Sequence, residues 1–228
     1  TTHGVRRSTL VIRGRLRKAA RRALAIRKLI KVDKRARALV NTGYRPQAIW
    51  GQEGQGFAPT TLRYLRGTIA NMTGCKRPGG CSTTSIRMSF GMDADPHILC
   101  RRQLFDNWLY ILDTLEDETQ ALQLAWRKMA TVLTRAKSRW QRVRGTMAAV
   151  IATLLDLQWR PMQADIWQDS DGEEFNLRRC DRARLLDFAL KGAAEEAVWK
   201  KASRGHLGRG LAGGVDLTSL RKHLRQLR

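Results

Sequence analysis

The sequence predicts a mainly α-helical protein: a helical bundle with a basic N-terminal helix and a small helix–β-hairpin–helix unit. Apolar residues recur at three- and four-residue intervals in at least six segments, which is the spacing of one face of an α-helix. Only residues 164–177 alternate apolar and polar residues as strands do. With 228 residues and 43% hydrophobic content, the chain is long enough to bury one core or two small ones.

Most of the net positive charge lies in the first two fifths of the chain. The formal net charge is +23, and residues 1–92 contain 20 of the 43 Lys and Arg residues but only two of the 20 acids. Within this part, residues 6–37 contain fourteen basic residues and a single acid, Asp33. Phosphates relieve the repulsion within such a run, so it indicates a polyanionic partner, RNA or DNA.

Residues 1–43 are expected to form one basic amphipathic helix, with Ser8 as its N-cap and Gly43 as its C-terminal stop. The apolar stripe that predicts it is Ile12, Leu16, Ala19, Ala23, Ile26 and Ile30. The residues expected to contact phosphates are Arg13, Arg17, Lys18, Arg21, Arg22, Lys28, Lys31 and Arg35. The alternative is a solvated helix face without a ligand.

Residues 44–144 predict a helical domain with glycine-rich loops. Glycines 51, 54 and 56 mark one loop, and residues 74–85 read as another. Pro59 opens the helix between them, and Asp95-Pro96 starts the next. The expected core faces of these two helices are Leu62, Leu65, Ile69 and Met72 in the first, and Phe105, Trp108, Leu109, Leu112 and Leu115 in the second.

A further helix is expected after the acidic junction at residues 113–118. Its apolar side is Leu122, Trp126, Met129, Leu133, Ala136 and Trp140. Residues 119–155 contain no acid, so the other side predicts a second basic surface. The phosphate contacts expected on this surface are Arg127, Lys128, Arg135 and Arg139.

Residues 145–202 predict the helix–hairpin–helix unit. An apolar helix follows Gly145 and ends by Trp159, and a β-hairpin turns at Asp171-Gly172. Asp181 then caps a helix whose inward residues are Leu185, Leu186, Ala189, Ala193 and Ala197. Residues 203–228 read as a glycine-rich linker and the start of a truncated helix near Asp216.

Several short motifs occur together in a recognisable order. They are Pro46-Gln47-Ala48-Ile49-Trp50-Gly51, Leu62-Arg63-Tyr64-Leu65-Arg66, Cys81 with Thr83-Thr84, Asp95-Pro96, Gly145 before the apolar helix, Ile166-Trp167, Trp199, and Gly213-Gly214-Val215-Asp216. Over nearly its whole length the chain resembles the region between the reverse transcriptase and RNase H-like domains of dinoflagellate LINE-like (non-LTR) retrotransposon polyproteins. It departs from the family at Thr146, where the family has proline.

The resemblance implies a reverse transcriptase domain upstream, and a Cys/His-rich segment with an RNase H-like domain downstream. It brings no catalytic residue to any position of this chain. The residues themselves agree, because the aromatic-x-Asp-Asp signature that holds two metal ions in a polymerase is missing. We therefore expect no enzymatic activity and no cofactor.

One set of residues has the chemistry of metal ligands: Cys75, Cys81, His97 and Cys100. Five residues separate the first pair, more than zinc sites usually have, so packed or loop thiols are the preferred interpretation and no metal is expected. Four cysteines and no secretory signal predict an intracellular protein, nuclear or cytoplasmic. No apolar run approaches the roughly 18 residues of a membrane span, so no membrane partner is expected.

Two functions remain open. The first is a non-catalytic nucleic-acid-binding segment that holds template RNA or target DNA through phosphate contacts. The alternative is a structural module that docks against the reverse transcriptase domain of its own polyprotein and does not bind nucleic acid independently.

Overall fold

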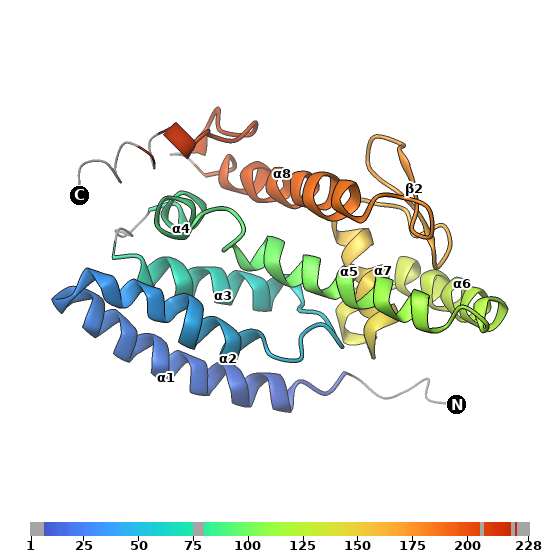
Figure 1. The fold of residues 1–228 in the computed structure, drawn as a ribbon, viewed down its shortest axis with the longest axis horizontal. Coiled ribbons are helices and arrows are strands. Elements are labelled where there is room, and N and C mark those ends of the chain that lie inside the picture. Colours follow the sequence, from blue (N-terminus) through green and yellow to red (C-terminus); the bar gives the residue numbers. More distant parts are fainter. Residues whose placement is uncertain (1–6, 75–79, 206–207, 220–221, 223–228) are drawn as a thin grey trace. The chain divides into compact units, whose positions relative to one another are not determined.

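The computed structural model describes residues 7–74, 80–205, 208–219 and 222 (Figure 1). These residues form a mainly α-helical protein with one antiparallel β-hairpin, as the sequence predicts. The α-helices described are α1 (Leu10–Val32), α2 (Arg45–Ile49), α3 (Pro59–Met72), α4 (Ser82–Phe90), α5 (Pro96–Thr114), α6 (Thr119–Arg135), α7 (Thr146–Asp156) and α8 (Leu190–Ala202). None of them is both long and apolar enough to cross a membrane.

The chain forms two units, and each is assembled from segments that are distant in sequence. One unit comprises Thr1–Ile12, Trp50–Ala58 and Cys100–Ala193. The other comprises Arg13–Ile49, Pro59–Leu99 and Ala194–Arg228. The two units thus combine helices from different stretches among those predicted, 1–43, 44–144, 145–202 and 203–228.

The basic segment is not one helix up to Gly43, as the sequence suggested. α1 ends at Val32, and the Asp33 carboxylate accepts the Arg35 backbone N–H at 2.8 Å, which caps a 3-10 turn, η1 (Lys34–Arg37). The chain then reverses through a π-helix, η2 (Val40–Tyr44), into α2 (Figure 1). Gly43 lies inside η2, where its carbonyl accepts a hydrogen bond from Arg22 at 3.1 Å.

The apolar faces of α1 and α3 contribute to the core as predicted, except that Ile12 and Leu16 of α1 are only half-buried. The buried residues are Ala19, Ala23, Ile26 and Ile30 of α1, and Leu62, Leu65, Ile69 and Met72 of α3. α4 was missed, because residues 74–85 read as loop. It begins at Ser82, two residues after the last glycine of that stretch, and it buries Ile86. Residues 75–79 lie outside the described part.

The second core surrounds α7, whose residues Ala148–Leu154 are all buried. α5 contributes Phe105, Trp108, Leu109 and Leu112, and α6 contributes Leu122, Trp126 and Leu133. Two expectations were wrong. Leu115 lies beyond the end of α5 and is 38% exposed, and α6 stops at Arg135, five residues before Trp140. Trp140 lies in a 3-10 turn, η3 (Arg139–Gln141), where its indole N–H donates to Asp156 at 2.7 Å.

The predicted hairpin is confirmed as β1 (Ile166–Gln168) and β2 (Glu174–Asn176), with Trp167 opposite Phe175. Asp181 caps the following helical segment through the Ala183 N–H, also as predicted. That segment opens as a π-helix, η4 (Arg184–Ala189), which has one more residue per hydrogen-bonded turn than an α-helix. Leu185 and Leu186 are buried as predicted, but after η4 the inward face is shifted by one position, from Ala189, Ala193 and Ala197 to Leu190, Ala194 and Val198.

The C-terminal glycine-rich stretch packs against the fold, whereas the sequence suggested a linker. A Cβ on Gly208 would lie 2.1 Å from the carbonyl oxygen of Ala202, so only glycine fits there. Asp216 accepts the Thr218 N–H at 2.7 Å, which is the capping bond of the expected last helix. Most of the residues that would continue that helix lie outside the described part.

Candidate nucleic-acid interface

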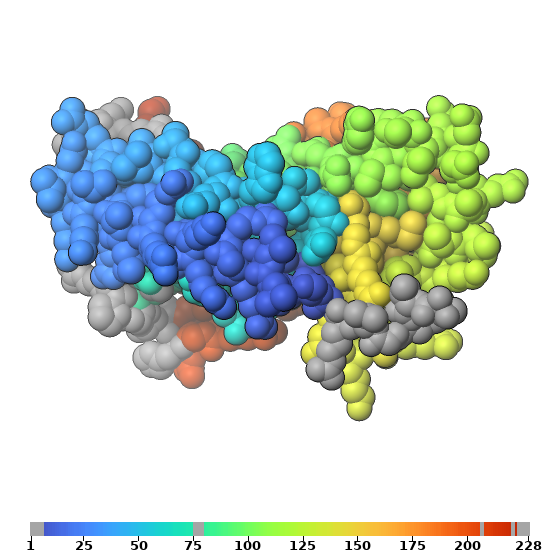
Figure 2. Space-filling model, turned by 90° about the horizontal axis from the view of Figure 1, so that it is seen from below, coloured from blue at the N-terminus to red at the C-terminus, as the bar shows by residue number. Residues whose placement is uncertain are grey.

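The outer face of α1 is the most concentrated charge in the described part of the chain. Its 23 residues include nine Lys and Arg and no acid. All eight residues of the N-terminal basic segment (residues 1–43) that were predicted to contact phosphates are exposed. Arg27, which was not among them, is exposed as well. Figure 2, which looks onto the side where α1 lies, shows its dark blue side chains open to solvent.

Helical geometry aligns five of these cations. At about 100° per residue, they project within an arc of about 80° on the side opposite the buried stripe. They are Arg13, Arg17, Arg21, Lys28 and Lys31. At a rise of about 1.5 Å per residue they span about 27 Å, the length of about eight base pairs of duplex DNA. We call these five residues the α1 stripe.

The α1 stripe lacks internal counter-charges. Among the described residues, the ion pair nearest to it in sequence joins Arg35 to Asp33 at 3.2 Å, after the end of α1, and no carboxylate pairs with the stripe itself. Arg22 also has an internal partner, the Gly43 carbonyl. Because the stripe cations are exposed and unpaired, they are open to phosphate oxygens at little desolvation cost.

The second predicted surface lies on α6. Arg127, Lys128 and Arg135 are exposed, as expected for phosphate contacts. Arg139 is different, because it lies past the end of the helix and its guanidinium is 3.7 Å from Asp156. Burial raises the pKa of Asp156, and hydrogen bonding from Trp140 and the charges of Arg101 and Arg139 oppose that rise. Arg139 thus neutralises an internal carboxylate.

Arg7 belongs to the basic run in sequence but has a structural role. Its guanidinium donates to the carbonyls of Gln55 and Gly56 at 2.8 and 2.6 Å, and it lies 5.4 Å from the ring centroid of Trp140. Burial lowers the pKa of Arg7. These contacts fix the N-terminal segment to its own unit, so Arg7 is not placed for a phosphate.

The structure does not bring the candidate zinc ligands together within the residues that it describes. Cys75 lies outside the described residues, and elsewhere in the described ranges no three His, Cys, Asp or Glu side chains are grouped as metal ligands. Cys100 is buried in α5. Cys81 precedes α4; burial acts to raise the pKa of its thiol, but hydrogen bonds from Thr84 and Thr83 outweigh burial and lower it.

Apolar residues that the sequence pattern did not single out face solvent beside the α1 stripe. Leu24 is 62% exposed, Leu29 50% and Val32 90%. Trp50 is also exposed, at 74%, whereas Trp167 is fully buried. Comparison of the chain with protein-family models, with curated proteins and with solved structures finds no match.

Proposed function

We propose that this chain is a non-catalytic nucleic-acid-binding segment of a retrotransposon polyprotein, and that it holds template RNA or target DNA through phosphate contacts. The observation that carries the proposal is the α1 stripe, five exposed cations on one helix face with no carboxylate paired to them among the described residues. The flanking reverse transcriptase domain of the same polyprotein would supply the chemistry.

The composition of α1 suits phosphate contacts. Between Leu10 and Val32 the helix has no Asn, Gln, Ser or Thr, and its exposed side chains are those of Arg, Lys and aliphatic residues. Phosphate contacts position a protein on nucleic acid and carry no sequence information. We therefore expect the α1 stripe to supply affinity that varies little with sequence.

Salt dependence tests this proposal directly. Each neutralised phosphate releases counterions, so log affinity should fall linearly with log salt by about 0.9 per contact on duplex DNA and about 0.7 on single strands. About six contacts would give a slope near −5 on duplex. Changing Arg17, Arg21, Lys28 and Lys31 to Gln should make the slope shallower by about 3 to 4, because these residues supply most of the contacts.

A matched control removes the same charge elsewhere. Arg102, Arg178, Arg182 and Arg184 are each ion-paired with a carboxylate, so changing these four to Gln lowers the net charge equally but removes no free cation. This control should retain the parental slope. A parental slope near −1, or equal slopes for the two fourfold variants, would contradict the assignment of the α1 stripe.

The exposed leucines favour a second candidate, docking against the reverse transcriptase domain. Leu24 and Leu29 add apolar area to the outer face of α1, which phosphate binding does not require. Changing both to Ser should abolish association with that domain if docking is their role, and should leave the salt slope unchanged. Association that survives the double change would remove this candidate.

A further inference from the structure

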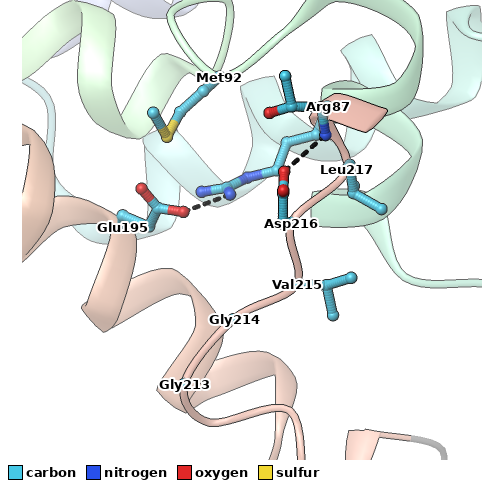
Figure 3. Close-up of a pocket in the computed structure, with 9 residues that line it drawn as sticks. Arg87, Met92, Glu195, Gly213, Gly214, Val215, Asp216 and Leu217 are labelled. Carbon is cyan, nitrogen blue, oxygen red and sulfur yellow. Dashed lines mark hydrogen bonds and ion pairs between the residues drawn. The ribbon is translucent and has the colours of Figure 1, made fainter. Parts of the chain in front are cut away.

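A pocket of about 350 Å³ opens between three segments of the unit that contains α3 and α4. Arg87 of α4 and Met92 line it, Glu195 of α8 lies beside them, and residues 213–218 pass along the remaining wall (Figure 3). The volume lies at the lower end of the range for small-molecule sites, so it suits a single ring system.

The wall formed by residues 213–218 is held in place. Gly214 has φ +86°, and a Cβ built on it would lie 3.0 Å from two ring atoms of Trp199. Only glycine lets the backbone pack this closely on the indole. Asp216 caps the Thr218 N–H two residues further on. These contacts fix this wall of the pocket against α8.

The charges in the pocket favour a hydrogen-bond donor as ligand. The Arg87 side chain is 7% exposed; it pairs with Glu195 and lies 5.0 Å from the Trp199 ring centroid, so its charge is met inside the protein. Glu195 Oε1 also accepts the Trp199 indole N–H at 3.3 Å. The Asp216 carboxylate accepts the Thr218 backbone N–H on Oδ1 and a second hydrogen bond from the Thr218 side chain. The lining of the pocket thus contains two carboxylates and one guanidinium, a balance that disfavours a phosphate; each carboxylate has about four acceptor sites, so lone pairs remain for a ligand donor.

Apolar side chains lie beside these acceptors, because Met92, Val215 and Leu217 also line the pocket. A planar ring with adjacent N–H donors satisfies both features. Among the nucleobases, guanine presents its N1–H and its 2-amino group side by side, so one carboxylate can accept both. The guanidinium of Arg87 lines the same pocket and offers donors to O6.

We propose that this pocket binds one unstacked guanine base of a single-stranded nucleic acid, with Asp216 accepting the N1–H and the 2-amino group. Single-stranded bases are commonly read in this way, on their Watson–Crick edges. The proposal rests on the proposed function and names the kind of strand that the chain would hold. It adds base preference to the sequence-independent contacts of the α1 stripe.

The test compares three labelled oligouridylates of equal length that carry a central guanosine, inosine or uridine. Inosine lacks only the 2-amino group. We expect the guanosine strand to bind about tenfold more tightly than the other two, the size of discrimination that a bidentate contact gives. Asp216→Asn should remove the preference and leave affinity for the uridine strand unchanged, because Asn still caps Thr218.

Asp169→Asn is the matched control. Asp169 also caps backbone N–H groups, those of Asp171 and Glu173, but it does not line the pocket. This variant should keep the full guanine preference. Equal binding of the three strands by the parent, or a preference that survives Asp216→Asn, would overturn the proposal.

Free guanosine separates this proposal from the proposed function. Guanosine has no phosphate, so it should shift the Met92 methyl resonance of the full chain whether or not the α1 stripe binds a strand. A shift in the parent but not in Asp216→Asn supports the pocket even if oligonucleotide binding fails. A shift with arginine amide but none with guanosine would reassign the pocket to a peptide side chain and overturn the guanine proposal.

Discussion

The guanidinium of Arg66 on α3 holds the carboxylate of Asp95, which immediately precedes α5, with Nε 2.9 and 3.0 Å from its two oxygens. Both residues are buried, at 9% and 1% exposure. Arg66 also donates to the Thr83 hydroxyl of α4 at 2.6 Å, and Asp95 accepts the His97 N–H at 2.9 Å. One buried ion pair thus joins α3 and α4 to the start of α5.

Asp95→Ala should lower the free energy of unfolding by about 3–5 kcal/mol, since it leaves the Arg66 charge buried without a partner. Urea denaturation followed by circular dichroism measures the change. Glu196→Ala removes an exposed acid from the same unit and should change stability by no more than about 0.5 kcal/mol. Similar losses in the two variants would show that the ion pair is not structurally important.

Arg7 and Arg17 should separate stability from binding. Arg7→Ala removes two hydrogen bonds to the carbonyls of Gln55 and Gly56, together with the contact to the Trp140 ring, and should lower the unfolding free energy by about 1–3 kcal/mol. Its salt slope for nucleic-acid binding should equal that of the parent. Arg17→Ala should do the reverse, with unchanged stability and a slope shallower by about 0.9 on duplex. A loss of slope in Arg7→Ala would count against its structural role.

Gly214→Ala should detach the C-terminal stretch. The substitution adds a Cβ at φ +86°, 3.0 Å from the Trp199 ring, a strain of about 1–3 kcal/mol. We expect faster tryptic cleavage at Arg209 and little change in the midpoint of global unfolding, because the strain is local. Gly213→Ala is the control, since nothing lies within 4 Å of its Cβ and its φ is ordinary. Equal cleavage rates in the two variants would argue against docking of this stretch.

Tyr44 should make stability depend on alkaline pH. Burial raises its pKa to about 12, with the Thr68 hydrogen bond opposing and Tyr64 adding to the effect. The unfolded chain ionises this tyrosine near pH 10, whereas the native state resists ionisation. The stabilisation is therefore fully present below pH 10 and is lost as pH rises toward 12, by about 2–3 kcal/mol. Urea unfolding of the parent should show a steeper decline over this range than Tyr44→Phe, and parallel curves would refute the assignment.

Periodicity was sufficient to predict the helices whose faces are long and uniform. All four apolar residues predicted for α3 are buried, and so are four of the six predicted for α1, the exceptions being the half-buried Ile12 and Leu16 in its first turns. The π-helix η4 leaves no mark in the sequence pattern, so the inward face of α8 was predicted one residue out of phase. The end of α1 at Val32 was not predicted, because a single Asp in a basic run does not by itself indicate a cap. Its capping hydrogen bond to the Arg35 N–H is seen only in the structure.

Charge patterns could not predict which Lys and Arg residues are free for a ligand and which have a partner within the protein. Arg7 and Arg139 lie in basic runs like their neighbours, yet each meets a partner supplied from elsewhere in the fold, Gln55 for Arg7 and Asp156 for Arg139. The pocket illustrates the same limit. Its walls come from α4, α8 and residues 213–218, which no single motif connects.

The α6 surface provides the last prediction, because the structure divides its four predicted residues into two groups. Arg127, Lys128 and Arg135 are exposed, and no ion pair joins them to a carboxylate in the described part of the chain, so changing all three to Gln should make the duplex salt slope shallower by up to about 2.7. Arg139→Gln should change the slope by less than one contact, because Arg139 is paired with Asp156. Anisotropy titrations over a range of salt concentrations give both slopes. An unchanged slope in the triple variant would limit the phosphate-binding surface to α1. A slope that becomes shallower by a full contact, about 0.9, in Arg139→Gln would mean that nucleic acid competes successfully with Asp156 for this arginine.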